Sequence, residues 1–182
     1  MTFSDRVLQR WRIAKAARFI PRGARVLDIG SADGALFDRL GGKIGGGLGI
    51  DPTLRGPAKA SNVPLVAGFF PKDMPAMETF DVITMLAVLE HFPAAEYAVV
   101  AEGCARFLKV GGRLIITVPS PAADHILKVL VRLRLVHGMC LGEHHGYEVE
   151  QTVRVFASPA FRLVWRRSFQ LGLNNLFVFE RV

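Results

Sequence analysis

The sequence predicts a single α/β domain whose helices cover both faces of a mostly parallel β-sheet. Strand-like apolar runs alternate with helical patterns along the 182 residues, as in a layered parallel sheet with right-handed crossovers. The first run, 25–29, ends in a tight glycine turn that leads into a short helix. Hydrophobic residues make up 51% of the chain, which is enough to form a full core. We therefore treat residues 1–182 as one domain.

The first half of the chain contains the elements that surround this turn. Ser4 is the predicted N-cap of a helix over 5–19, which the Pro21-Arg22-Gly23 turn follows. Pro52 ends the second strand because proline cannot donate a ladder hydrogen bond. We expect strands at 25–29, 46–51 and 63–68, a helix at 35–40, an irregular or helical segment at 54–61 and a loop at 69–79.

Prolines and glycines also divide the second half of the chain. Pro93 is typical of a first helical position, and Gly111-Gly112 is typical of a helix C-terminus. Ser120-Pro121 is a second N-cap and proline pair, and a long, mainly apolar segment follows it. We expect strands at 81–86 and 113–118, helices at 94–108 and 121–137, and a C-terminal antiparallel hairpin formed by 162–170 and 175–180.

The turn after the first strand is typical of a nucleotide site. Gly30 and Gly34 flank it, and glycine there allows a positive φ and close approach of a ligand to the backbone. Their spacing is G-x-x-x-G, whereas the dinucleotide fingerprint is G-x-G-x-x-G. Asp28 and Asp33 would repel a pyrophosphate. They suit a ligand with hydroxyls, an ammonium group and a sulfonium.

The segment Asp28-Ile29-Gly30-Ser31-Ala32-Asp33-Gly34 closely resembles motif I, D-x-G-x-x-x-G, of the class I S-adenosylmethionine-dependent methyltransferases. Three further blocks resemble the family's second strand, its fourth strand with the following loop, and its fifth strand with the preceding turn. The four blocks lie in the family's order at 26–34, 49–51, 80–92 and 108–119. One glycine turn alone would be weak evidence for this family, but four blocks in the family's order are strong evidence.

The resemblance implies a three-layer Rossmann-like sandwich with a mostly parallel, seven-stranded sheet and an antiparallel C-terminal strand. It also implies an enzyme that binds S-adenosyl-L-methionine and transfers its methyl group. The cofactor-binding residues carried over or proposed from their positions are Asp28, Gly30, Ser31, Asp33, Gly34, Asp51, Pro52, Phe69 and Leu86. Asp51, at the end of the second strand, would accept the ribose hydroxyls, although an acid there would also suit NAD.

Adenine recognition departs from the family pattern. Many relatives have an acid after the glycine that follows the third strand, whereas here Gly68 is followed by Phe69 and Phe70. An aromatic ring can stack on adenine but cannot accept a hydrogen bond from its amino group. Asp73 would take that role only if the loop bends back toward Gly68.

The candidate catalytic residues are three histidines, His91, His144 and His145. His91 follows the fourth strand and is a candidate general base, and a hydrogen-bonded structural role fits equally well. His144 and His145 lie in a polar cluster with Tyr147, which is either on the substrate side or a loop fixed by hydrogen bonds. Cys140, His144 and a carboxylate could bind zinc in principle, but no metal motif is visible, and we expect a metal-independent enzyme.

Charge and hydropathy leave the acceptor and the partners open. The net charge of +7 permits RNA, DNA or an anionic membrane as a partner, although most basic proteins bind none of these. The helix at 121–137 would line a lipid-like substrate tunnel, rest on a membrane, or pack as plain core. We expect an N-terminal helical segment at 1–20, and a helix and loop at 121–150 on the substrate side of the domain. The expected acceptor is a small or lipid-like molecule.

Two cysteines, the lack of an apolar signal core and the lack of a spanning apolar run favour a cytoplasmic protein, either a monomer or a homodimer. Two other function classes remain open at this stage. One is a non-catalytic or NAD-type nucleotide-binding module on the same fold. The other is an RNA methyltransferase, which would bind RNA with a strong dependence on salt.

Overall fold

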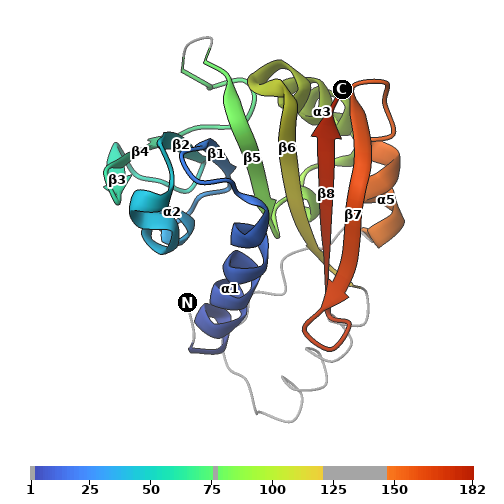
Figure 1. Cartoon of the computed structure of the whole chain (residues 1–182), viewed down its shortest axis with the longest axis horizontal. Helices are drawn as coiled ribbons and strands as arrows, with labels where there is room; N and C mark the ends of the chain where they lie inside the picture. Colours follow the sequence, from blue (N-terminus) through green and yellow to red (C-terminus); the bar gives the residue numbers. More distant parts are fainter. Residues whose placement is uncertain (1–2, 76–77, 121–146) are drawn as a thin grey trace.

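The computed structural model describes residues 3–75, 78–120 and 147–182. In these ranges eight strands form one sheet in the order β3-β4-β2-β1-β5-β6-β8-β7 (Figure 1). The strands are β1 (Arg25–Ile29), β2 (Gly46–Asp51), β3 (Ala58–Ala60), β4 (Val63–Ala67), β5 (Phe80–Leu86), β6 (Leu108–Pro119), β7 (Phe161–Phe169) and β8 (Asn174–Arg181).

Helices cover both faces of the sheet, so the domain has three layers. α1 (Phe3–Ala16) and α2 (Ala35–Leu40) pack on one face, and α3 (Tyr97–Phe107) and α5 (Val149–Val155) pack on the other (Figure 1). Short 3₁₀ helices extend the connections: η1 (Ala17–Phe19), η2 (Gly41–Lys43), η3 (Leu89–His91) and η4 (Ala94–Glu96). The three-layer α/β fold predicted from the sequence is confirmed.

Five neighbouring strands, β4, β2, β1, β5 and β6, run parallel, so their carboxyl ends meet at one edge. β8 is antiparallel to β6, and β7 is antiparallel to β8. The reversed C-terminal strand and the C-terminal hairpin are therefore confirmed. Ligands bind outside the carboxyl ends of strands in open parallel sheets, so this edge is where a site is expected.

The sheet has one strand more than the seven predicted. Residues 54–61 were predicted to be irregular or helical, but Ala58–Ala60 forms β3, which pairs antiparallel with β4 at the sheet edge. Ser61 and Asn62 connect the two strands, and both have positive φ angles, 45° and 68°. Positive φ at both central residues is the geometry of a tight type I′ hairpin. The Ser-Asn pair was the overlooked signal.

The Gly111-Gly112 pair does not end a helix. α3 ends at Phe107, and the chain enters β6 at the next residue. Phe80 pairs with Leu108 and Val82 pairs with Arg113, so the intervening residues of β6 bulge out of the ladder. Gly111 has a φ of 76°, which is why glycine suits this bulge.

Other boundaries differ by small shifts. α1 begins at Phe3, so Ser4 lies inside the helix and is not its N-cap, and Pro93 is the N-cap residue of η4 and not its first helical residue. Helix boundaries of this kind vary by one or two residues. The predicted helix at 121–137 lies outside the described residues. No helix among the residues described is long and apolar enough to span a membrane.

α5 is a helix that the sequence analysis missed. Its N-cap is Glu148, whose side chain and that of Gln151 form a reciprocal capping box. Glutamate is an unusual N-cap, so the pattern did not stand out. Phe156, which follows α5, is 1% exposed, and its ring lies 5.5 Å from that of Phe161 and 5.4 Å from that of Phe179. Phe156 therefore attaches the end of α5 to the β7–β8 hairpin.

Phe156→Ala should lower the free energy of unfolding by about 3 kcal/mol, because it leaves a cavity among packed aromatic rings. Urea unfolding followed by circular dichroism measures this loss. Val164→Ala is the control, since Val164 on β7 is 43% exposed and should change stability little. Equal and small losses for the two variants would contradict the packing role assigned to Phe156.

Candidate active site

The turn after β1 is held against β2 by backbone hydrogen bonds. The amides of Gly30 and Ser31 both donate to the carbonyl of Ile50, over 2.8 and 3.3 Å. Gly30 has a φ of 75°, and a Cβ on it would lie 2.3 Å from Val88 Cγ2. Gly34 has a φ of 73°, and a Cβ on it would lie 2.3 Å from the Cβ of Ala60. Both positions therefore require glycine for conformation and for space.

Asp51, the last residue of β2, binds two backbone segments at once. Its Oδ2 accepts a hydrogen bond from the amide of Ala32 over 2.9 Å. Its Oδ1 accepts hydrogen bonds from the amide and from the hydroxyl of Thr53, over 2.8 and 2.5 Å. A carboxylate has about four lone-pair positions, so one position on Oδ2 stays open toward a ligand. Asp51 therefore shapes the turn as well as offering an acceptor.

Asp28 is the buried acid of the site. It is 5% exposed, and its Oδ1 accepts a hydrogen bond from the Thr84 hydroxyl on the neighbouring strand β5, over 2.6 Å. Burial raises the pKa of Asp28 to about 7, the Thr84 hydrogen bond opposes that rise, and the negative charges of Asp51 and Asp33 add to it. Three acids thus interact at one edge of the sheet, and a cation bound there would favour the ionised form of Asp28.

Ser31 completes the floor of the turn. Its side chain is 4% exposed, and its hydroxyl oxygen has no hydrogen-bond partner. Gly49 of β2 leaves room for it, because a Cβ on Gly49 would lie 2.7 Å from Ser31 Oγ. A buried hydroxyl without a partner is costly, so this group is suited to bind a polar ligand atom.

Asp33 links the turn to two helices. Its Oδ1 accepts the amide of Ala35 at the start of α2, over 3.2 Å, and the side-chain amide of Gln9 on α1, over 3.1 Å. Asp33 thus caps the first turn of α2 and connects α1 to the site. Pro52 lies exposed in the turn after Asp51.

The loop after β4 does bend back. The amide of Phe69 donates to Asp73 Oδ2 over 2.9 Å, and the Asp73 amide donates to the carbonyl of Phe69 over 2.9 Å. A Cβ on Gly68 would lie 2.6 Å from the Cβ of Asp73. The carboxylate of Asp73 therefore lies beside Gly68, which was the condition for it to replace the missing acid. Phe69 is 64% exposed, so its ring is available for stacking.

The end of β5 lies beside the end of β1, since Met85 pairs with Ile29. Leu86 is the last residue of β5, and Ala87 after it has a φ of 61°, a strained value for alanine. The Ala87 amide donates to the Thr117 carbonyl over 2.9 Å, which holds this conformation. His91 is exposed on η3, five positions beyond β5, and its amide donates to the carbonyl of Val88 over 3.0 Å.

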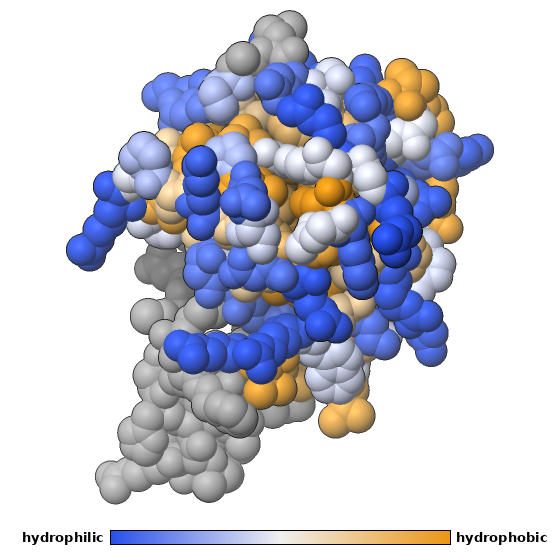
Figure 2. All heavy atoms as spheres, turned by 60° about the vertical axis from the view of Figure 1, so that its left-hand side comes forward, coloured by the Kyte–Doolittle hydropathy of each residue, from blue (hydrophilic) through white to orange (hydrophobic). Residues whose placement is uncertain are grey.

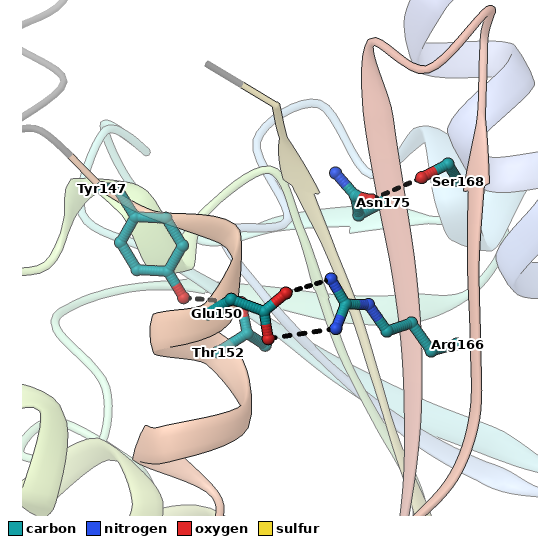
Figure 3. A network of polar contacts seen from close by, with 6 residues as sticks. All are labelled: Tyr147, Glu150, Thr152, Arg166, Ser168 and Asn175. Carbon is teal, nitrogen blue, oxygen red and sulfur yellow. Dashed lines mark hydrogen bonds and ion pairs between the residues drawn. The ribbon is translucent and has the colours of Figure 1, made fainter. Parts of the chain in front are cut away.

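Tyr147 does not present its hydroxyl to solvent. It is 8% exposed, and its hydroxyl shares a hydrogen bond of 2.7 Å with that of Thr152 on α5 (Figure 3). Burial raises the pKa of Tyr147, so it stays protonated at neutral pH. Figure 3 also shows Arg166 of β7 bound by both guanidinium nitrogens to Glu150 of α5, over 2.6 and 3.1 Å. This network fastens α5 to the sheet.

The structure brings all nine predicted cofactor residues to the carboxyl edge of the sheet: Asp28, Gly30, Ser31, Asp33, Gly34, Asp51, Pro52, Phe69 and Leu86. His144 and His145 lie outside the described residues, as does Cys140. Within the described ranges no group of three or more histidine, cysteine or acidic residues is placed to hold a metal ion.

Sequence reasoning missed three contributors, Thr84, Thr53 and Val88. Thr84 bonds to Asp28, Thr53 bonds to Asp51, and the side chain of Val88 fills the space above Gly30. Only Thr53 carried a local signal, a hydroxyl two residues after an acid in a turn. The other two depend on the register of β1 against β5.

Comparison with known proteins identifies a family. The family model described as "Methyltransferase domain" matches residues 3–163. A protein named "Ubiquinone biosynthesis O-methyltransferase" from Xanthomonas oryzae pv. oryzae (strain PXO99A) is 28% identical over 179 residues, covering 88% of this chain and 68% of that protein.

Solved structures share the fold. The N-methyltransferase NodS from Bradyrhizobium japonicum WM9 superposes with a TM-score of 0.70 at 18% identity, covering 98% of this chain and 99% of NodS. Its structure in complex with S-adenosyl-L-homocysteine gives a TM-score of 0.68 at 18% identity, over 94% of this chain and 86% of that one.

Asp28 should make the stability of the ligand-free protein depend on pH. Its pKa is higher in the folded state, about 7, than the usual value of about 3.9 in an unfolded chain. The folded state therefore holds a proton that the unfolded state releases. The stabilisation of the folded state by this proton is complete below about pH 3.9 and is lost as the pH rises through 7.

Urea unfolding between pH 5 and pH 8 tests this for the wild type and for Asp28→Asn. The stability of the wild type relative to Asp28→Asn should fall as the pH rises, because asparagine does not titrate. The control Asp38→Asn changes an exposed acid on α2 and should give a pH profile parallel to that of the wild type. A parallel profile for Asp28→Asn would show that Asp28 is ionised throughout.

Proposed function

The chain belongs to the methyltransferase domain family, and we propose that it transfers a methyl group to an oxygen atom of a small molecule. It is an S-adenosylmethionine-dependent enzyme. The observation that carries this function is the acid-lined turn after β1, which lies against the end of β2. Asp28, Asp33 and Asp51 interact at one edge of the sheet, which suits a ligand with cationic groups and hydroxyls and repels a pyrophosphate. The NAD-type alternative is therefore not favoured.

The residues at this edge fit the cofactor. Asp28 would face its ammonium group, which would hold the carboxyl in the ionised form. Asp51 would accept a ribose hydroxyl at the open position of Oδ2, and a second one if the Thr53 hydroxyl turns away. Ser31 Oγ, which has no partner, would bind a polar atom of the cofactor. Phe69 would stack on the adenine ring, and the Asp73 carboxylate would accept a hydrogen bond from the amino group of adenine.

S-Adenosylmethionine supplies an activated methyl group on a sulfonium, and the protein supplies orientation and electrostatics. Leu86 and Ala87 form the apolar end of β5 beside the turn, and the strained φ of Ala87 sets the direction of the loop after it. That loop carries His91 on η3. A hydroxyl acceptor must lose its proton, and His91 is the general base that we assign to that step.

The proposal that the acceptor atom is oxygen is based on the relatives of this chain. The protein from Xanthomonas oryzae is named for an O-methyl transfer in ubiquinone biosynthesis, and its similarity covers 88% of this chain. A phenol-like hydroxyl on a small apolar molecule is consistent with this likeness and with the apolar end of β5. Neither feature favours a methyl transfer to RNA.

Calorimetric titration tests the cofactor. S-Adenosylmethionine and S-adenosylhomocysteine should bind with dissociation constants on the order of micromolar, and NAD should not bind. Asp51→Asn should weaken binding at least about tenfold, since it removes the charge and an acceptor position. Gly34→Ala should abolish binding, because its Cβ would meet that of Ala60 at 2.3 Å and displace the turn.

Gly23→Ala is the matched control. Gly23 has a φ of 75°, like Gly34, but a Cβ there meets nothing within 4 Å. It should keep the affinity of the wild type despite a similar backbone strain. Failure of the wild type to bind either adenosyl compound would refute the assignment, and so would equal losses in the two glycine variants.

A methyl-transfer assay with phenolic acceptors and primary amines tests the acceptor atom. We expect turnover with phenols, detected as S-adenosylhomocysteine release, and none with amines. His91→Gln should lower kcat and remove the pH dependence that a general base gives to the rate. Glu96→Gln, an exposed neighbour on η4, is the control. Turnover with amines alone, or an unchanged pH profile in His91→Gln, would contradict the proposal.

A further inference from the structure

Two grooves meet at Arg18 on the face of the sheet that carries α1 and α2. The first has a volume of about 320 Å³ and lies between the end of α1 and β7. The second has a volume of about 220 Å³ and lies between the end of α1 and the segment after α2. Arg18 lines both, so the two grooves are neighbours that share one cationic wall, and together we call them the track.

The track is basic. Its cationic residues are Lys15, Arg18 and Arg167 in the first groove, and Arg18, Arg22, Arg39 and Lys43 in the second. No acidic side chain is among the described residues that line either groove. Ion pairs in the described part of the chain include those of Arg25, Lys109, Arg162 and Arg166, and no cation of the track takes part in one. Its positive charge is therefore available to an anionic ligand.

The first groove also has aromatic walls. Phe19, Trp165 and Phe169 line it, and all three are half-buried. The rings of Phe19 and Trp165 lie 4.8 Å apart at an angle of 51°, so each supports the other. Cations beside aromatic faces are the combination on which single-stranded nucleic acids bind, with phosphates on the cations and bases on the rings.

The track is separate from the methyl-transfer site. In the second groove, Pro21 and Arg22 lie just before β1 begins, at the amino end of that strand, whereas the Gly30 turn lies at its carboxyl end. The first groove reaches the carboxyl end of the sheet, because Arg167 pairs with Leu176, which pairs with Thr117 near the end of β6. It lies apart from the turn because β5, β6 and β8 separate β7 from β1. The side of the molecule that carries α2 is covered mainly by hydrophilic side chains with apolar ones between them (Figure 2).

We propose that this track binds single-stranded nucleic acid. Two neighbouring grooves that share a cationic wall suit an extended polyanion better than a single small anion. Their concave shape and recessed aromatic rings do not suit a flat membrane surface, which is bound by protruding apolar groups. The proposal does not depend on the identity of the methyl acceptor.

Fluorescence anisotropy with a labelled oligouridylate of about 12 nucleotides tests the proposal. At low salt the full-length protein should bind it with a dissociation constant on the order of micromolar. The triple variant Lys15→Gln, Arg18→Gln, Arg167→Gln should weaken binding at least about tenfold. The logarithm of the binding constant falls linearly with the logarithm of the salt concentration, and the variant should make this slope less steep by about 2. That is the change expected when three contacts to phosphates of a single strand are lost.

Two control variants separate the track from net charge and from general stability. The triple variant Lys59→Gln, Lys72→Gln, Arg154→Gln makes the same change of charge at exposed residues that line neither groove, and should bind as the wild type does. Trp165→Leu should weaken binding about tenfold without changing the salt slope, because it removes a stacking contact and no charge. Trp11→Leu, at a tryptophan that is 44% exposed and outside both grooves, should have no effect.

Four results would overturn the proposal. The first is no binding of the oligonucleotide by the wild type. The second is an equal loss in the two triple variants, which would reduce the effect to net charge. The third is equal affinity for a blunt duplex, whose paired bases are not free to stack on the aromatic rings of the groove. The fourth is binding to anionic phospholipid vesicles through Lys15, Arg18 and Arg167 in place of the oligonucleotide.

Discussion

The site depends on one contact, the attachment of the turn after β1 to the end of β2. The Ile50 carbonyl accepts the amides of Gly30 and Ser31, and the Asp51 carboxylate accepts the amide of Ala32. The parallel register of β1 and β2 places these groups side by side. The turn therefore has one conformation before any ligand binds, so little conformational entropy is lost on binding. Substitutions that disturb this contact act on folding and on ligand binding together.

The same contact concentrates negative charge. Asp28 is the fourth residue of β1, Asp51 ends β2 and Asp33 lies in the turn after β1. Burial, together with the charges of Asp51 and Asp33, raises the pKa of Asp28 to about 7. A buried acid of this kind destabilises the ligand-free protein at neutral pH. A cationic ligand reverses that cost, since it pairs with the carboxylate. The site is thus less stable alone than with the ligand that it is shaped to bind, as functional sites commonly are.

The sequence allowed the prediction of those features that depend on local patterns. β1, β2 and α2 have the bounds predicted, because apolar runs, a proline and the glycine turn delimit them. β3 was missed because its three residues carry no periodicity, and only pairing with β4 makes them a strand. The contact between Thr84 and Asp28 was missed because it joins residues 56 positions apart. The sequence analysis could state only that Asp73 would replace the missing acid if its loop bent back, and could not predict the bend itself. Loop geometry cannot be derived from composition.

The distribution of charge explains why a chain with a net charge of +7 carries an acidic ligand site. The acids gather at the carboxyl ends of β1 and β2, while the unpaired cations of the track lie along α1, around the amino end of β1 and on β7, which β5, β6 and β8 separate from β1. At physiological ionic strength the screening length is about 8 Å, so the acidic edge and the track each act on their own ligands. The acidic edge favours a ligand with cationic groups, whereas the track favours an anionic one. The strand that we propose for the track would thus be a second ligand of the domain, whatever the methyl acceptor is.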